Sequence, residues 1–162
     1  MTQRTKGEIL AIFKSCDADG NGKIDKEEFV KGLSMIFDID KLESAEAYKQ
    51  FLLTIFDLCD KREWFNCFQR DGVLDLNEFE RVVNAIPTDM NPNIKVNLGE
   101  MIFNIINEDG SKFIEKREMA RFLRYSSFSD KKAAEFIQEL DKDGDGQISL
   151  PEFLIWFQNL DH

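Results

Sequence analysis

Two stretches of the chain carry oxygen-bearing side chains at the same spacing, which suggests that they bind a hard cation. Residues 17–28 read DADGNGKIDKEE, and residues 141–152 read DKDGDGQISLPE. Oxygen-bearing side chains occupy positions 1, 3, 5 and 9 of both stretches, glycine occupies position 6, and glutamate occupies position 12. An ion such as Ca²⁺ takes about six to eight oxygen ligands, and clustered carboxylates repel one another unless a cation lies between them. We therefore predict that each stretch is a metal-binding loop.

The ligands of these two loops follow from their positions. A tight loop points alternate side chains inward, a backbone carbonyl serves at position 7, and glutamate at position 12 can offer both of its oxygens. Glycine at position 6 supplies the positive φ that the turn requires. In loop one the predicted ligands are Asp17, Asp19, Asn21, the Lys23 carbonyl, Asp25 (directly or through water) and Glu28. In loop four they are Asp141, Asp143, Asp145, the Gln147 carbonyl, Ser149 (through water) and Glu152.

Apolar residues flank these loops at matching offsets, and the same pattern occurs twice more along the chain. Four residues before each loop stand Phe13, Leu53, Phe103 and Ile137, and at position 8 stand Ile24, Leu74, Ile114 and Ile148. The flanking apolar residues recur with a helical period. The repeated unit is therefore helix, loop, helix, with a second loop over 57–78 and a third over 107–118. Asp17 and Asp57 are 40 residues apart but Glu28 and Glu78 are 50 apart, which predicts ten inserted residues inside loop two.

With four such units, the sequence resembles the EF-hand superfamily, and most closely its four-hand proteins of the calmodulin and sarcoplasmic calcium-binding type. The resemblance covers nearly the whole chain and implies that calcium ions are the ligand. It also implies an all-α fold of two EF-hand pairs. In each pair a short two-stranded β bridge would join the loops at position 8, Ile24 to Leu74 and Ile114 to Ile148.

Loop three reads NEDGSKFIEKRE and has a full set of oxygen ligands, but it lacks glycine at position 6. The predicted ligands are Asn107, Asp109, Ser111, the Phe113 carbonyl, Glu115 and Glu118. Lys112 stands at position 6, where a positive φ costs a non-glycine residue about 1 kcal/mol, and its charge lies near the cation. We expect weak calcium binding here; the alternative is a structural loop that only pairs with loop four.

Loop two keeps both ends of the pattern around its insertion. The predicted ligands are Asp57, Asp71, the Val73 carbonyl, Asp75 and Glu78, with Gly72 at the turn and Asp60 or Gln69 as substitutes for position 3. The entropic cost of closing a loop grows only logarithmically with its length. The insertion therefore weakens this site without excluding calcium.

The insertion also carries an aromatic cluster, Trp64, Phe65 and Phe68. Leaving such side chains in water costs about 1.5–3 kcal/mol each relative to full burial. Our first interpretation is a flap that folds back onto the core of its own lobe. The alternative is an exposed anchor for a protein partner, since aromatic residues dominate binding energy at interfaces.

Proline divides the chain into two predicted domains. Residues 86–93, IPTDMNPN, hold two of the three prolines and interrupt any continuous central helix. We predict an N-terminal EF-hand pair over 1–86, a linker over 87–93 and a C-terminal pair over 94–162.

Composition restricts the function further. A net charge of −10 argues against nucleic acid as a partner, and no apolar run is long enough to span a membrane. The single histidine, His162, does not support a Ser–His or Cys–His nucleophile, so we expect no enzyme. Fifteen Phe against five Met favour a calcium buffer with a stiff core, because buffer EF-hands barely open. The alternative is a sensor that exposes an apolar surface to a protein partner when calcium binds. We also expect a monomer.

Two further features have simple interpretations. The three cysteines are odd in number and form no CxxC pair, which favours reduced thiols and the cytoplasm; an intracellular calcium-storing granule is the alternative. Arg117, Arg121 and Arg124 share one face of a predicted helix. We interpret this basic stripe as a solvated face, and the alternatives are contact with an acidic partner or with the protein's own acidic surface.

Overall fold

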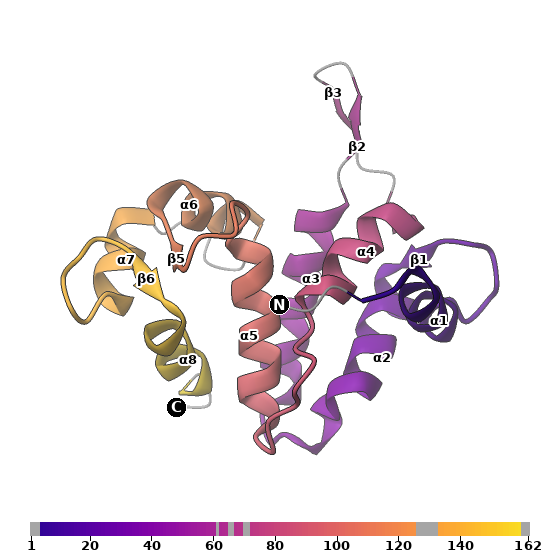
Figure 1. The fold of residues 1–162 in the computed structure, drawn as a ribbon, viewed down its shortest axis with the longest axis horizontal. Coiled ribbons are helices and arrows are strands. Elements are labelled where there is room, and N and C mark those ends of the chain that lie inside the picture. Colours follow the sequence, from indigo (N-terminus) through magenta and orange to yellow (C-terminus); the bar gives the residue numbers. More distant parts are fainter. Residues whose placement is uncertain (1–3, 61, 65–66, 70–71, 126–132, 160–162) are drawn as a thin grey trace.

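The computed structural model describes residues 4–60, 62–64, 67–69, 72–125 and 133–159, and these residues are mostly helical (Figure 1). The helices are α1 (Lys6–Cys16), α2 (Lys26–Phe37), α3 (Ala45–Cys59), α4 (Leu76–Ala85), α5 (Ile94–Ile106), α6 (Lys116–Tyr125), α7 (Ala133–Leu140) and α8 (Leu150–Gln158), with a short 3₁₀ helix over Ile39–Lys41. The strands are β1 (Ile24–Asp25), β2 (Arg62–Trp64), β3 (Cys67–Gln69), β4 (Val73–Leu74), β5 (Phe113–Ile114) and β6 (Ile148–Ser149). The predicted succession of helix, loop and helix is confirmed. None of the described helices combines the length and apolar character needed to cross a membrane.

Helices α2, α4 and α8 all begin in the same way, because each starts with a capping box. The residue before the helix accepts the backbone N–H of the glutamate three positions later, and that glutamate accepts the backbone N–H of the cap. The three pairs are Asp25 with Glu28, Asp75 with Glu78, and Ser149 with Glu152. Positions 9 and 12 of these loops therefore fix the start of the helix that follows.

The predicted β bridges are confirmed in both halves of the chain. β1 pairs with β4 in antiparallel fashion, with Ile24 opposite Leu74, and β5 pairs with β6, with Ile114 opposite Ile148. All four of these side chains are fully buried. Each bridge therefore connects two loops rigidly and anchors both to the core.

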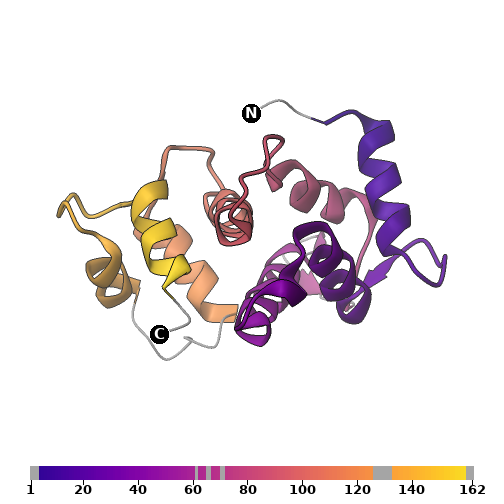
Figure 2. The ribbon, with the colours of Figure 1, turned by 90° about the horizontal axis from the view of Figure 1, so that it is seen from below.

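The two halves of the molecule pack against each other across α5, which lies in the middle of both views (Figures 1 and 2). Their buried apolar side chains form one cluster that runs from α1 to α8. Polar contacts also cross between α4 and α5: Nη2 of Arg81 donates to the Ile105 carbonyl at 2.9 Å, and Nδ2 of Asn104 donates to the Ala85 carbonyl at 3.2 Å. The segment between α4 and α5 contains the predicted linker, residues 87–93, and the division of the chain into domains 1–86 and 94–162 stays a prediction.

Helix α3 belongs to the first half but inserts two aromatic side chains into the second. Tyr48 is fully buried, its ring lies 5.2 Å from that of Phe157, and its hydroxyl donates to the Phe157 carbonyl at 3.4 Å. The ring of Phe51 lies 6.3 Å from Phe122, 5.9 Å from Trp156 and 5.3 Å from Phe157. The apolar face of the C-terminal half is therefore covered by α3.

The insertion in loop two forms a β-hairpin from β2 and β3. Arg62 lies opposite Gln69, and Trp64 lies opposite Cys67. In Figure 1 this ribbon rises away from the helices, which differs from the predicted flap folded onto the lobe. Phe65 and the side chains of Trp64 and Phe68 lie outside the described part of the structure.

Candidate metal centres

Loop one brings three carboxylates together between α1 and α2. Asp17 follows the last residue of α1, and Glu28 lies in the first turn of α2. One oxygen from each of Asp17, Asp19 and Glu28 lies within 4.8 Å of the others. The Gly22 N–H donates to Oδ2 of Asp17 at 2.9 Å, and Gly22 has a φ of 81°. This set of hard oxygen donors around a tight turn fits Ca²⁺.

Loop four, between α7 and α8, also gathers three carboxylates, but they come from positions 1, 3 and 5, and Glu152 is not one of them. Oxygens of Asp141, Asp143 and Asp145 lie within 4.8 Å of one another. The Gly146 N–H donates to Oδ2 of Asp141 at 2.7 Å, as the equivalent glycine does in loop one. Hydrogen bonds from the Gly146 amide, followed by those from other loop amides, hold the pKa of Asp141 below its usual range. Loop four therefore keeps Asp141 ionised and ready to bind a cation.

The crowding of negative charge is visible in the third residue of each loop. The Asn21 amide lowers the pKa of Asp19, but desolvation and the neighbouring Asp17 and Glu28 carboxylates outweigh it and raise this pKa overall. Asp143 behaves in the same way: the Asp145 amide lowers its pKa, but desolvation and the nearby carboxylates raise it overall. A cation in the loop relieves this repulsion, which is the electrostatic reason for metal binding at both positions.

The remaining predicted ligands of loops one and four lie along the same turns. Oδ1 of Asn21 accepts the Lys23 N–H at 2.8 Å, and Lys23 directly precedes β1. Gln147 directly precedes β6 in the corresponding position. At position 9, the side chains of Asp25 and Ser149 cap α2 and α8. Because position 9 is already used as a helix cap, contact with a metal through water suits these two side chains better than direct contact.

Loop three avoids the strain that the sequence predicts at Lys112. Among the non-glycine residues that the structure describes, only Asp38 has a positive φ, so Lys112 lies outside the left-handed region. Gly110, at position 4, has a φ of 70°. The expected cost at position 6 is therefore wrong, because the backbone bypasses the conformation that glycine adopts in loops one and four.

The ligand atoms of loop three are instead bonded to one another. Nδ2 of Asn107 donates to the Ser111 carbonyl, and Oγ of Ser111 donates to the Phe113 carbonyl at 2.7 Å. Glu118 is buried, with Oε1 accepting the Asp109 N–H at 3.2 Å and Oε2 accepting the Glu115 N–H at 2.9 Å. Among the described residues, three carboxylates converge only in loops one and four. A cation must therefore break internal hydrogen bonds to enter loop three.

Loop two begins at Asp60, and the prediction that it begins at Asp57 is wrong. Helix α3 continues through Asp57 to Cys59, and Nζ of Lys26 lies 3.1 Å from Oδ1 of Asp57. Asp60 follows the helix end with only 2% of its surface exposed. Its Oδ2 accepts the Gly72 N–H at 3.1 Å, which is the contact made by the first aspartate and the turn glycine of loops one and four.

Backbone geometry supports the same register. Asp60 has φ −74° and ψ 74°, and Asp17 has φ −75° and ψ 82°. Each amide N–H donates to the carbonyl four residues earlier, Phe56 at 2.8 Å and Phe13 at 2.9 Å. Loop two therefore runs over 60–78, which is 19 residues, or seven more than the twelve of loop one.

A sequence similarity before the loops also indicates that loop two begins at Asp60, although the spacing of the aspartates favoured Asp57. Residues 13–17 read FKSCD and residues 56–60 read FDLCD, so phenylalanine and cysteine stand at the same offsets before both loops. Asp75 caps α4, Glu78 lies in its first turn and Val73 lies in β4, as predicted for the second part of the loop. Asp71 lies outside the described residues.

Comparisons with known proteins agree with this geometry. A family model for an EF-hand domain pair matches residues 95–158, and a model for a single EF hand domain matches residues 8–36. Calcium-binding protein CML19 of Arabidopsis thaliana is 27% identical over 157 residues, covering 95% of this chain and 83% of the relative. A calcineurin subunit of Naegleria gruberi is 27% identical over 159 residues, covering 94% and 78%. Parvalbumin beta of Boa constrictor is 39% identical over 59 residues, covering 33% and 54%.

The fold and the acidic loops define a helix–loop–helix metal-binding protein. The chain contains EF-hand domains at residues 8–36 and 95–158 and is a calcium-binding EF-hand protein.

Proposed function

We propose that this protein is a calcium buffer whose two halves use their apolar faces to bind each other. The observation that carries this proposal is the burial of Tyr48 and Phe51 of α3 against α8 and α6. A sensor presents such an apolar face to an amphipathic partner helix when calcium arrives. Here the face is already occupied within the chain, so calcium binding has less apolar surface to release.

The rest of the described surface supports this proposal. Its exposed large apolar side chains are Leu10, Met35, Leu76, Met90 and Ile155. They come from α1, α2, α4, the segment before α5, and α8. Apolar side chains scattered singly over a surface are normal and do not mark a docking site.

We assign the strongest calcium binding to loops one and four, because each gathers three carboxylates. Loop three binds more weakly, since its ligand oxygens accept or share internal hydrogen bonds and its first residue is a neutral asparagine. If loop two binds calcium, Asp60 replaces Asp57 as the first ligand, together with Asp71, the Val73 carbonyl, Asp75 and Glu78. Through the β bridges, binding in loops one and four orders the weaker loop of each pair.

Calorimetry on the metal-stripped full chain tests the buffer function. Calcium is titrated with and without millimolar magnesium, and the same samples are assayed with an apolar fluorescent dye. We expect two tight sites that magnesium weakens, a weaker third site, and no gain of dye fluorescence when calcium is added. Binding that ignores magnesium, together with a calcium-dependent gain of dye fluorescence, would contradict the buffer and favour a sensor.

A sensor with a single protein partner is the second candidate, and the β2–β3 hairpin favours it. The hairpin rises from the helical body in Figure 1, and its sequence includes Trp64, Phe65 and Phe68. One relative is by its name a subunit of calcineurin. The double substitution Trp64→Ser with Phe68→Ser then leaves calcium stoichiometry intact and abolishes capture of the partner. Loss of folding in this variant would instead assign the aromatic cluster to the core.

We place the protein in the cytoplasm as a monomer. Cys16 is a free thiol buried in the core, and reduced cysteines are typical of that compartment. Imaging of the tagged full chain tests the location and separates it from a calcium-storing granule.

A further inference from the structure

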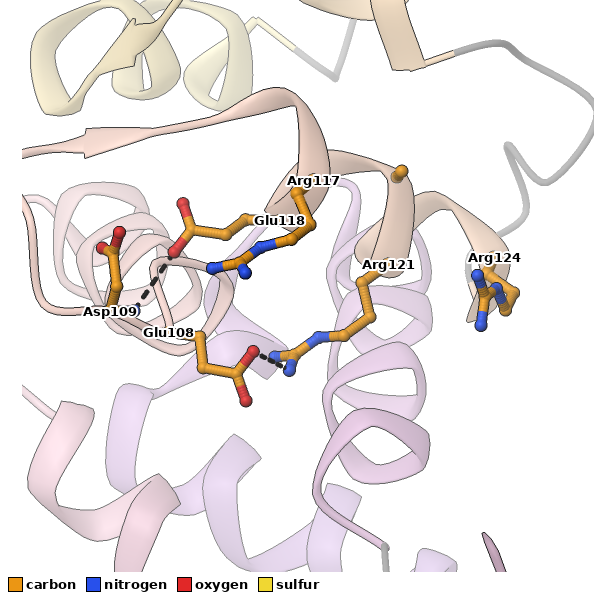
Figure 3. A pocket seen from close by; sticks show the side chains of 7 residues that line it. Glu108, Asp109, Arg117, Glu118, Arg121 and Arg124 are labelled. Carbon is orange, nitrogen blue, oxygen red and sulfur yellow. Dashed lines mark hydrogen bonds and ion pairs between the residues drawn. The ribbon is translucent and has the colours of Figure 1, made fainter. Parts of the chain in front are cut away.

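An open cavity of about 570 Å³ lies between loop three and α6, and three arginines line one side of it (Figure 3). They are Arg117, Arg121 and Arg124, and the facing acidic residues are Glu108, Asp109 and Glu118. We propose that this cavity binds an acidic segment of a protein partner. The site is separate from the calcium ligands of loops one and four, and it goes beyond calcium buffering.

The acidic side chains of the cavity are engaged in contacts of their own. Glu118 is 2% exposed and accepts backbone N–H groups from Asp109 and Glu115. Oδ1 of Asp109 accepts the Ser111 N–H at 2.8 Å. Glu108 forms an ion pair with Arg121, which Figure 3 marks with a dashed line. Backbone N–H donors leave the charges of Asp109 and Glu118 in place, so these carboxylates balance part of the row, and the donors left for a ligand are those of Arg124 and the Nη2 of Arg121.

Some guanidinium N–H groups of this row have no acceptor within the described structure. Arg117 and Arg124 are exposed, and neither makes a hydrogen bond or ion pair with any residue that the structure describes. Nη1 of Arg121 pairs with Glu108, but its Nη2 is buried without a hydrogen-bond partner within the described structure. A buried guanidinium N–H without an acceptor is costly, and a carboxylate ligand would satisfy it.

The shape of the row indicates the kind of ligand. Arg117 and Arg124 are seven residues apart on one helix face, which is about 10 Å along the axis. In Figure 3 the three side chains follow the helix as a row and do not converge on one point. A row of this length suits several carboxylates on one segment better than a single phosphate ion. In a chain with a net charge of −10, the guanidinium donors that this row leaves unpaired suit an acidic partner by charge complementarity.

The predicted site is connected to loop three through Glu108. This residue holds Arg121 from loop position 2, so a partner carboxylate must compete with Glu108 for the same guanidinium. Removing the Glu108 charge should therefore strengthen binding of the acidic segment, whereas removing the arginine charges should weaken it. If the arginines form only a solvent-exposed face of α6, neither substitution should change peptide binding.

Fluorescence anisotropy of a fluorescein-labelled deca-glutamate peptide, with deca-glutamine as the neutral peptide, tests the proposal on the full chain. The variant Arg117→Gln with Arg121→Gln and Arg124→Gln should bind at least about tenfold more weakly. Glu108→Gln should bind up to about fivefold more tightly. The charge-matched control replaces the exposed Lys14, Lys31 and Lys116 by Gln, none of which lines the cavity. The single change Arg124→Gln, at an exposed position, serves if the triple variant does not fold.

Equal peptide binding by the wild type and the arginine variants would overturn the proposal. An equal loss in the lysine control would also overturn it, since only net charge would then matter. Displacement of the peptide by an equal concentration of inorganic phosphate would assign the cavity to a phosphate ligand instead. A parallel calcium titration of each variant shows whether loops one and four still bind, so failure of this site is distinguishable from failure of the calcium buffer.

Discussion

Replacing Phe51 by alanine should separate the contact between the two halves and reveal the surface that α3 covers. Phe51 is 7% exposed and has ring contacts with Phe122, Trp156 and Phe157. Phe→Ala in a core costs about 3–5 kcal/mol, and each favourable ring pair adds about 0.5–1.5 kcal/mol beyond the buried area. We therefore expect a loss near the upper end, about 4–5 kcal/mol in the free energy of unfolding.

The matched control is Phe29→Ala. Phe29 is fully buried, and its ring contacts, with Phe56 and Phe79, stay within the first half of the chain. Both variants should lose stability, but only Phe51→Ala should bare the apolar face of α8. Dye fluorescence should therefore rise in Phe51→Ala, in calcium and in chelator alike, and stay near the wild-type value in Phe29→Ala.

The emission of Trp156 gives a second readout for the same contact. Its ring lies 5.9 Å from that of Phe51, so its emission should shift to longer wavelength when Phe51 is truncated. Trp64→Phe as the background leaves Trp156 as the only tryptophan. If Phe51→Ala folds without a gain of dye fluorescence or a shift of Trp156, the covered face does not explain buffering. Phe51→Leu keeps most of the volume and extends the test if the alanine variant does not fold.

Three further predictions concern the loops and a buried thiol. Asp60→Asn should weaken calcium binding at loop two by about tenfold, because a charged ligand is lost. Asp57→Asn should leave that binding unchanged. It should lower the free energy of unfolding by less than about 1 kcal/mol, since only a partly exposed ion pair is removed. Calorimetry compares calcium binding by the two variants, and a larger loss of binding in Asp57→Asn would refute the Asp60 register. Calcium affinity at loop one should fall as pH falls through the raised pKa of Asp19, because protons then compete with the calcium ion. Calcium titrations at pH 7 and pH 4.5 measure this change, and equal affinities at the two pH values would contradict the prediction. Burial raises the pKa of the Cys16 thiol. The contribution of this thiol to stability is therefore present below the unfolded pKa of about 8.5 and is lost as pH rises through the pKa of the folded state. The free energy of unfolding, measured by denaturation at pH 7.5 and pH 9.5, should fall more in the wild type than in Cys16→Ser.

Much of this protein was predictable from sequence because the calcium loops are local structures. The ligands, the turn glycine and the helix caps of residues 17–28 lie within twelve consecutive positions, so their spacing alone specifies the loop. The β bridges join residues far apart in the sequence, and they were predictable from the resemblance to paired EF-hands rather than from local spacing. Position 8 of each loop is a buried apolar residue, and paired EF-hand loops bring these positions opposite each other.

Loop two shows where local pattern became ambiguous. Asp57 and Asp60 are three residues apart, and apolar residues precede both at helical spacing, so either can open a loop. The helix end decides between them, and it depends on how far α3 stays packed in the core. Because α3 continues to Cys59, Asp57 stays on the helix beside Lys26, and Asp60 meets Gly72.

Only the tertiary structure decided which surfaces are covered and which charges meet. Tyr48 and Phe157 are 109 positions apart in sequence, and their contact follows from the packing of α3 against α8. The ion pair between Glu108 and Arg121 likewise needs α6 to fold back beside loop three. The sequence shows that each of these side chains is apolar or charged. It does not show which residue each one contacts, because that residue lies on another helix or loop. The sequence by itself therefore determined the four units and the calcium chemistry of loops one and four, because those depend on neighbours along the chain. The register of loop two, the contact of α3 with α8 and the arginine cavity depend on packing between elements, and for that reason the structure was needed to define them.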